Sequence, residues 1–221
     1  MKCPLPLILT LTLCAAASPP VSADVPLYLA LYGGANHSDL FEDDGANPDL
    51  AFIQSPTIGY TLGGAVGAPL AFLPGVSAEL DVSWRVNKSS GTRSLKNTPT
   101  ALSGEDSTYA LLANLRYTQP LTEEVSIYGL IGGGYGSRRI SLEPVPSNFY
   151  PNGMGADRSS FVWQLGGGVD YALTEEVKVG VGYRYFKAPT IGRIIEWGCE
   201  SGFFNASGEN QAAVVTVTFQ Q

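Results

Sequence analysis

The segment "GVSAELDVSWRVN", residues 75–87, decides the fold class because apolar and polar residues alternate along it without interruption. Val82 and Trp84 fall on one face, whereas Glu79 and Arg85 fall on the other. A period of two residues is typical of a β-strand and not of a helix. The sequence therefore predicts an extended strand here, with one apolar and one polar face.

The same alternation recurs in seven further segments, so the chain predicts eight strands in all. These segments are "VPLYLALYGGA" (25–35), "PTIGYTLGGAVGA" (56–68), "STYALLANLRYTQ" (107–119), "EVSIYGLIGGGYG" (124–136), "SFVWQLGGGVDYA" (160–172), "EVKVGVGYRYF" (176–186) and "QAAVVTVTFQ" (211–220). No sustained helical period and no later run of 18 apolar residues competes with this interpretation.

The connections between these strands alternate between short and long. The letters LTEEV occur at 121–125 and again at 173–177, and each copy joins two strands by a short connection. The residues 36–55, 88–104, 138–157 and 188–209 form long connections. An up-and-down meander places every short turn at one end, so we interpret the paired glutamates of LTEEV as solvated turn residues and not as a catalytic pair.

The N-terminus has the layout of a secretory signal peptide. Lys2 precedes an apolar run, and Val21-Ser22-Ala23 offers small residues for cleavage. We therefore predict a signal peptide over 1–23 and one barrel domain over 24–221. Cys199 is then the single cysteine of an exported chain, and the net charge of -7 argues against nucleic acid as a partner.

The polar faces indicate which side of the barrel meets lipid. They consist mostly of Gly, Ser, Thr and Ala with isolated charges, which suits a narrow interior better than a surface in water. Aromatic residues gather near the strand ends, as in the two interfacial girdles of membrane barrels. The predicted interface aromatics are Trp84, Tyr109, Tyr117, Tyr135, Trp163, Tyr171, Tyr183, Tyr185 and Phe219. A soluble periplasmic carrier, with its apolar face inward as in lipocalins, is the alternative.

The isolated charges should meet inside the barrel, because an unpaired buried charge is costly. The predicted interior polar network consists of Glu79, Asp81, Arg85, Asn114, Arg116, Gln164, Asp170, Lys178 and Arg184.

The segments "FVWQLGGGVDYALTEEVKVGVGYRYFK" (161–187) and "AAVVTVTF" (212–219) resemble the opacity-protein or outer membrane protein beta-barrel family, whose architecture is similar to the OmpA and OmpX barrels. The resemblance implies an all-β, eight-stranded antiparallel up-and-down transmembrane barrel with four long surface loops and three short periplasmic turns. It also implies a bacterial outer-membrane location, a monomer, and recognition of the last strand, ending in Phe219, by the barrel assembly machinery.

Enzyme and metal chemistry find little support in the sequence. His37, Ser38 and Asp39 are adjacent, whereas a catalytic triad is defined by spatial geometry. The acidic segment "DLFEDDGANPD" (39–49) does not match the calcium-loop pattern, since Leu40 falls at the first ligand position. We predict no cofactor, no metal and no enzyme activity.

Two functions remain open at the level of sequence. The first is a structural or surface-interaction role, in which the interior is filled and the loops meet lipopolysaccharide, host, phage or other surface ligands. The second is a narrow porin-like channel for small solutes. Interior cations that are paired with carboxylates favour the first function, whereas cations that line open water favour the second.

Overall fold

The computed structural model describes residues 26–39, 52–55, 57–95, 98–145, 154–197, 200–206 and 208–220. Within these ranges eight long strands form one closed sheet. They are β1 (Tyr28–Asp39), β3 (Thr57–Pro69), β4 (Val76–Leu95), β5 (Thr98–Pro120), β6 (Val125–Val145), β7 (Met154–Ala172), β8 (Val177–Lys187) and β11 (Glu209–Gln220).

Each barrel strand pairs in antiparallel fashion with its neighbours in the chain, and the first strand closes the ring with the last. Tyr28 lies opposite Gln220 and Asp39 lies opposite Glu209 in the β1–β11 ladder. Closure leaves no exposed edge, which is the only way for a sheet to satisfy its backbone in lipid. The predicted eight-stranded up-and-down barrel is confirmed.

The strands extend further than the alternating segments predicted. The β4–β5 ladder continues to Leu95 and Thr98, and the β6–β7 ladder continues to Leu142 and Met154, so much of the expected loop at 88–104 and 138–157 is paired. The backbone pairing continues there without the apolar alternation that reveals a strand in sequence.

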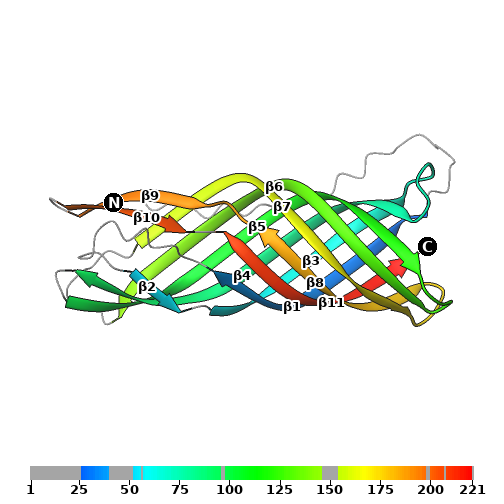
Figure 1. Ribbon diagram of the computed structural model, residues 1–221, viewed down its shortest axis with the longest axis horizontal. Helices are drawn as coiled ribbons and strands as arrows, with labels where there is room; N and C mark the ends of the chain where they lie inside the picture. The colour runs from blue at the N-terminus through cyan, green and yellow to red at the C-terminus, as the bar shows by residue number, and fades with distance from the viewer. Residues whose placement is uncertain are drawn as a thin grey trace, which may run out of the picture.

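Three short strands lie in the other long connections. β2 (Phe52–Ser55) pairs with β4, and β9 (Ile191–Trp197) forms a hairpin with β10 (Glu200–Ala206). Figure 1 shows these strands at one end of the barrel, on the left, whereas the short turns and the end of β11 lie at the other.

The two LTEEV turns have the same hydrogen bonds. The Thr122 hydroxyl accepts from the Val125 amide at 2.9 Å, and the Thr174 hydroxyl accepts from the Val177 amide at 3.0 Å. In each turn the leucine amide also donates to the valine carbonyl. The sequence repeats because the two hairpins need the same turn. The third turn, between β3 and β4, uses Gly75 in the left-handed region, with φ at 79°.

Several sequence-based expectations fall outside the described residues. The signal peptide predicted for 1–23, most of the acidic segment 39–49 and Cys199 belong to this group. Among the described residues, no helix has the length and apolar character needed to cross a membrane.

The two faces of the sheet differ as the alternation requires. Large apolar side chains such as Leu80, Ile131 and Val181 are exposed on the outer face. The inner face combines buried charges and amides with a small apolar cluster of Ala110, Leu112, Val162, Phe186 and Ala188. The buried charged side chains lie on the inner face, where their pairing determines what the interior can do.

A polar network in the barrel interior

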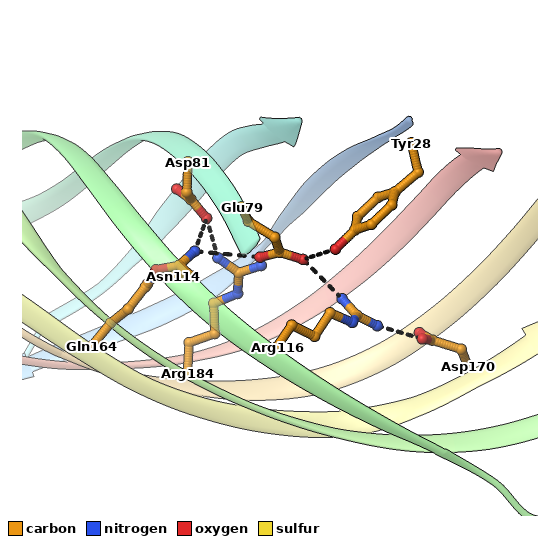
Figure 2. Close-up of polar contacts among 8 residues, drawn as sticks. All are labelled: Tyr28, Glu79, Asp81, Asn114, Arg116, Gln164, Asp170 and Arg184. Atoms are coloured by element: carbon orange, nitrogen blue, oxygen red, sulfur yellow. Dashed lines mark hydrogen bonds and ion pairs between the residues drawn. The ribbon is translucent and has the colours of Figure 1, made fainter. Parts of the chain in front are cut away.

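A charged cluster crosses the lumen nearest the short turns. Arg116 from β5 forms ion pairs with Asp170 from β7 and with Glu79 from β4, the latter at 3.7 Å. Glu79 also accepts hydrogen bonds from the Tyr28 hydroxyl at 2.9 Å and from the Asn114 amide at 3.3 Å. Figure 2 shows how these side chains converge from several strands. Arg116 thus connects three strands through the interior.

A second ion pair lies beside the first. Arg184 from β8 contacts Asp81 from β4 at 2.8 Å, and Asp81 is fully buried. Asn114 donates to Asp81 at 3.5 Å and accepts from the Gln164 amide at 2.9 Å. Asn114 therefore joins the two ion pairs into one continuous network (Figure 2).

Aromatic rings fill the space between these charges. The Arg116 guanidinium lies over the Tyr128 ring, and that of Arg184 lies over the Tyr32 ring, each 3.7 Å from the ring centroid. The Tyr32 hydroxyl also donates to Asp81 at 2.9 Å. Guanidinium groups are well suited to this position because they are planar and weakly hydrated. The rings lie beside the charged side chains and narrow the interior further at this level.

Arg85 is bonded differently from the other interior arginines. It is 2% exposed and donates to the Ser83 hydroxyl at 2.6 Å, while its guanidinium lies 3.7 Å from the centroid of the Phe186 ring. Within the described ranges no carboxylate lies within ion-pair distance of it. Its Nε atom has no hydrogen-bond partner among the described residues.

A further buried pair lies toward the long hairpins. Arg138 from β6 contacts Asp106 from β5 at 2.8 Å and donates to the Pro189 carbonyl at 3.1 Å. Pro189 is buried and follows the end of β8, where the chain leaves for the β9–β10 hairpin. Arg138 therefore bonds the start of this segment to β6.

Three asparagines from different strands form a chain of side-chain hydrogen bonds. Asn87 donates to Asn36 at 2.9 Å, and Asn210 donates to Asn87 at 3.2 Å. The three residues are buried and come from β4, β1 and β11, respectively. This chain spans the strands that close the barrel.

Lys178 lies apart from the network. It is half-buried near the start of β8, opposite Thr218 and Ala172, and it lines a cavity at the short-turn end together with Arg116 and Asp170. It forms no ion pair with any other residue that the structure describes. The structure thus places eight of the nine predicted network residues among buried polar groups and leaves Lys178 at the edge.

At the opposite end, Lys187 and Glu209 pair on the outside of the barrel at 2.7 Å. The hydrogen bond and charge of the Lys187 ammonium hold the pKa of the Glu209 carboxyl below its usual range. The two side chains are 32% and 41% exposed, so solvent screens this pair far more than the buried ones.

The aromatic residues predicted for the membrane interface all lie on the outer face of their strands. Trp84 stacks on Tyr109 with ring centroids 5.9 Å apart, and Trp163 packs against Tyr185 at 5.3 Å. The nine positions are Trp84, Tyr109, Tyr117, Tyr135, Trp163, Tyr171, Tyr183, Tyr185 and Phe219. Their assignment to two girdles remains a prediction.

Sequence reasoning missed several interior groups. Asp106 lies just outside the predicted strand 107–119, and Arg138 lies in the predicted long connection 138–157. Tyr32 and Tyr128 were not assigned to a face. The signal was present, because Asp106 has the same parity as Asn114 and Arg116 in the same strand. Extending the alternation beyond the apolar segment would have identified it.

The comparison with family models settles the family. The model described as "Outer membrane protein beta-barrel domain" matches residues 7–219. The chain belongs to this family. It is accordingly a bacterial outer-membrane barrel, as the sequence predicted. The comparison with curated proteins gave no significant match.

Solved outer-membrane barrels share the fold at low sequence identity. OprG from Pseudomonas aeruginosa is 13% identical, with a TM-score of 0.54 and coverage of 89% of this chain and 96% of its own. Neisserial surface protein A is 16% identical, with a TM-score of 0.51 and coverage of 88% and 96%. The outer membrane protease OmpT from Escherichia coli is 8% identical, with a TM-score of 0.50 and coverage of 93% and 99%. At these identities the likeness shows the fold alone.

His37 and Ser38 do not form a catalytic pair by adjacency in this outer-membrane barrel. They are successive residues of β1, so their side chains project to opposite faces of the sheet. Ser38 is buried and donates to the Glu209 carbonyl at 3.1 Å. Among the residues whose placement is described, no group of three or more His, Cys, Asp or Glu side chains could hold a metal ion.

Proposed function

We propose that this outer-membrane barrel has a structural and surface-interaction role and is neither an open channel nor an enzyme. In this proposal, the interior network stabilises a rigid scaffold in the membrane. The long hairpins present contact surfaces to lipopolysaccharide and to ligands on host cells, phage or other surfaces. The scaffold and the contact surfaces are thereby separated along the barrel axis.

The observation that carries this proposal is the pairing of two interior arginines with carboxylates across the lumen. Arg116 pairs with Asp170 and Arg184 pairs with Asp81, in each case between strands that are not neighbours in the sheet, whereas Arg138 pairs with Asp106 of the adjacent strand. Each pair therefore occupies part of the narrow space that eight strands enclose. A solute would have to separate buried charge pairs to pass, and leaving one charge unpaired there is costly.

The hairpins support the surface role. From Tyr109 to Thr98, β5 continues for about 11 residues, which is roughly 36 Å along the strand. A paired hairpin of this length holds residues well away from the membrane at low entropic cost, since its backbone is already ordered. Such a surface is suited to contact with a partner.

The membrane and assembly partners follow from the outer face. Exposed apolar residues from every barrel strand offer a surface to lipid, and we propose that the barrel is monomeric in it. Phe219, 45% exposed near the end of β11, is the residue we assign to recognition by the barrel assembly machinery. Its ring lies on the lipid-facing side of the strand.

A planar-bilayer recording tests the proposal. The refolded barrel should produce no discrete conductance steps under conditions in which an open porin does. Arg116→Ala tests the main cross-lumen contact, and Lys88→Ala, on the exposed face of β4, is the matched control. Discrete steps in the unmodified protein that change in Arg116→Ala, but not in Lys88→Ala, would establish the narrow-channel function instead.

A further inference from the structure

A cavity of about 260 Å³ opens at the short-turn end of the barrel. Its lining includes Leu70, Leu73 and Pro74 from the β3–β4 turn, and also the charged residues Arg116, Asp170 and Lys178. The volume is slightly below the roughly 300–1,000 Å³ typical of drug-sized ligands. The site therefore combines apolar and charged residues around a space that could hold a small molecule.

The charges of this cavity are unevenly balanced. Arg116 is already paired with Asp170 and Glu79, and both carboxylates are buried. Glu79 does not line the cavity, and its oxygens also accept from Tyr28 and Asn114. Both carboxylates thus bond to other donors. The Lys178 ammonium lies near enough to Asp170 to interact with its charge, but it forms no ion pair among the described residues.

We propose that this cavity binds a small anion-bearing molecule, in which a carboxylate or phosphate monoester is attached to a short apolar group. Lys178 pairs with the anionic group, at a position where partial burial strengthens the attraction relative to open water. The apolar group packs against Leu73 and Pro74. The ligand enters from the periplasmic side, so the site is independent of the surface hairpins and of any passage through the barrel.

A solution NMR titration of the refolded, isotope-labelled protein in detergent micelles tests this site. The probes are n-butyl phosphate, butyrate, inorganic phosphate and butylamine. We expect saturable shifts of the amide signals of Thr118, Lys178 and Thr218 with the two butyl anions, weaker binding of inorganic phosphate, and no saturable response to butylamine. The relative strength of butyl phosphate and butyrate distinguishes the two anionic groups.

Two variants test the charged and the apolar contributions to binding separately. Lys178→Gln should weaken butyl phosphate binding about ten-fold or more, since a charge-assisted contact is lost. Leu73→Ser should weaken butyl phosphate but leave inorganic phosphate unchanged. Lys88→Gln, an exposed lysine on β4, should bind like the unmodified protein.

Dispersed amide spectra and heat-modifiable gel mobility show whether each variant has folded. If Lys178→Gln does not fold, Leu73→Ser decides the test. Linear shifts, an equal response to butylamine, or equal binding by folded Lys178→Gln would each overturn the proposal. A silent bilayer would not affect it, so this test and that of the proposed function fail separately.

Discussion

At the scale of single residues, the barrel depends on which charges are buried. Asp81 is fully buried beside Arg184, and its removal leaves a cation in a water-poor interior. The exposed pair of Lys187 and Glu209 has similar geometry, with the same kind of N–O contact at 2.7 Å, but lies in solvent. Burial, and not the N–O distance, therefore decides how much each ion pair contributes to stability.

We predict that Asp81→Asn lowers the free energy of unfolding by about 3–5 kcal/mol, the usual cost of breaking a buried ion pair. Glu209→Gln should cost no more than about 1 kcal/mol because its pair is exposed. Urea titration of the two variants in the same lipid or detergent gives the comparison. Equal losses in the two variants would contradict the distinction between buried and exposed pairs.

Two glycines of β6 differ in the space that surrounds them. A methyl group at Gly134 would come too close to the Leu111 carbonyl oxygen of the neighbouring strand, whereas one at Gly129 would meet only the Gly166 carbonyl, at 4.0 Å. Gly134 thus allows a close approach of two strands, and Gly129 faces open space.

Gly134→Ala should therefore lower the folded fraction or the melting temperature markedly, and Gly129→Ala should have little effect. Heat-modifiable gel mobility after refolding measures the folded fraction of both. If both variants refolded equally well, the close approach of β5 and β6 would not require glycine.

At the scale of elements, the barrel uses one turn twice. Thr122 and Thr174 accept backbone hydrogen bonds from equivalent positions, although the strands that they join differ in sequence and length. Each threonine satisfies two amides that the hairpin ladder leaves unpaired. The glutamates that follow each threonine are exposed, and Glu124 accepts a hydrogen bond from the Tyr171 hydroxyl at 2.8 Å.

Thr122→Val and Thr174→Val should each cost about 1 kcal/mol of unfolding free energy, the typical net value of a hydrogen bond. Glu123→Gln should change stability by less than about 0.5 kcal/mol, as exposed substitutions usually do. Urea titration of the three variants measures these costs. A large loss in Glu123→Gln, or a loss in only one threonine variant, would show that the two turns are not equivalent.

At the scale of the whole molecule, we propose that the aromatic residues of the outer face set the depth of the barrel in the membrane. Trp84 and Trp163 lie on β4 and β7, each in contact with a tyrosine of the same face. Because amphipathic rings favour the level of the headgroups, the two tryptophans should lie near one interface and not at the bilayer centre.

Single-tryptophan variants that retain Trp84 or Trp163 test this placement by fluorescence quenching with brominated lipids. Bromine placed near the headgroup should quench both residues more strongly than bromine placed near the end of the acyl chain. Stronger quenching by bromine near the end of the acyl chain, or no quenching by either lipid, would show that the two tryptophans do not lie at the membrane interface.

The sequence by itself determined the strands and their faces. Alternation assigned Glu79, Asp81 and Arg85 to the polar face of one strand, because successive side chains of a strand point to opposite sides. It also identified the LTEEV turns from their recurrence. These features are local, so they can be read over a few neighbouring residues.

Only the tertiary structure decided which residues meet inside the barrel. Arg184 pairs with Asp81, 103 residues earlier in the chain. Arg138 donates to the Pro189 carbonyl, a partner outside the predicted polar network. Strand register and closure set these contacts, and neither is encoded by the alternation of a single strand. The partner of an inward charge depends on the strands across the lumen, and for that reason the sequence predicted a polar interior but not its pairs or the exceptional position of Lys178.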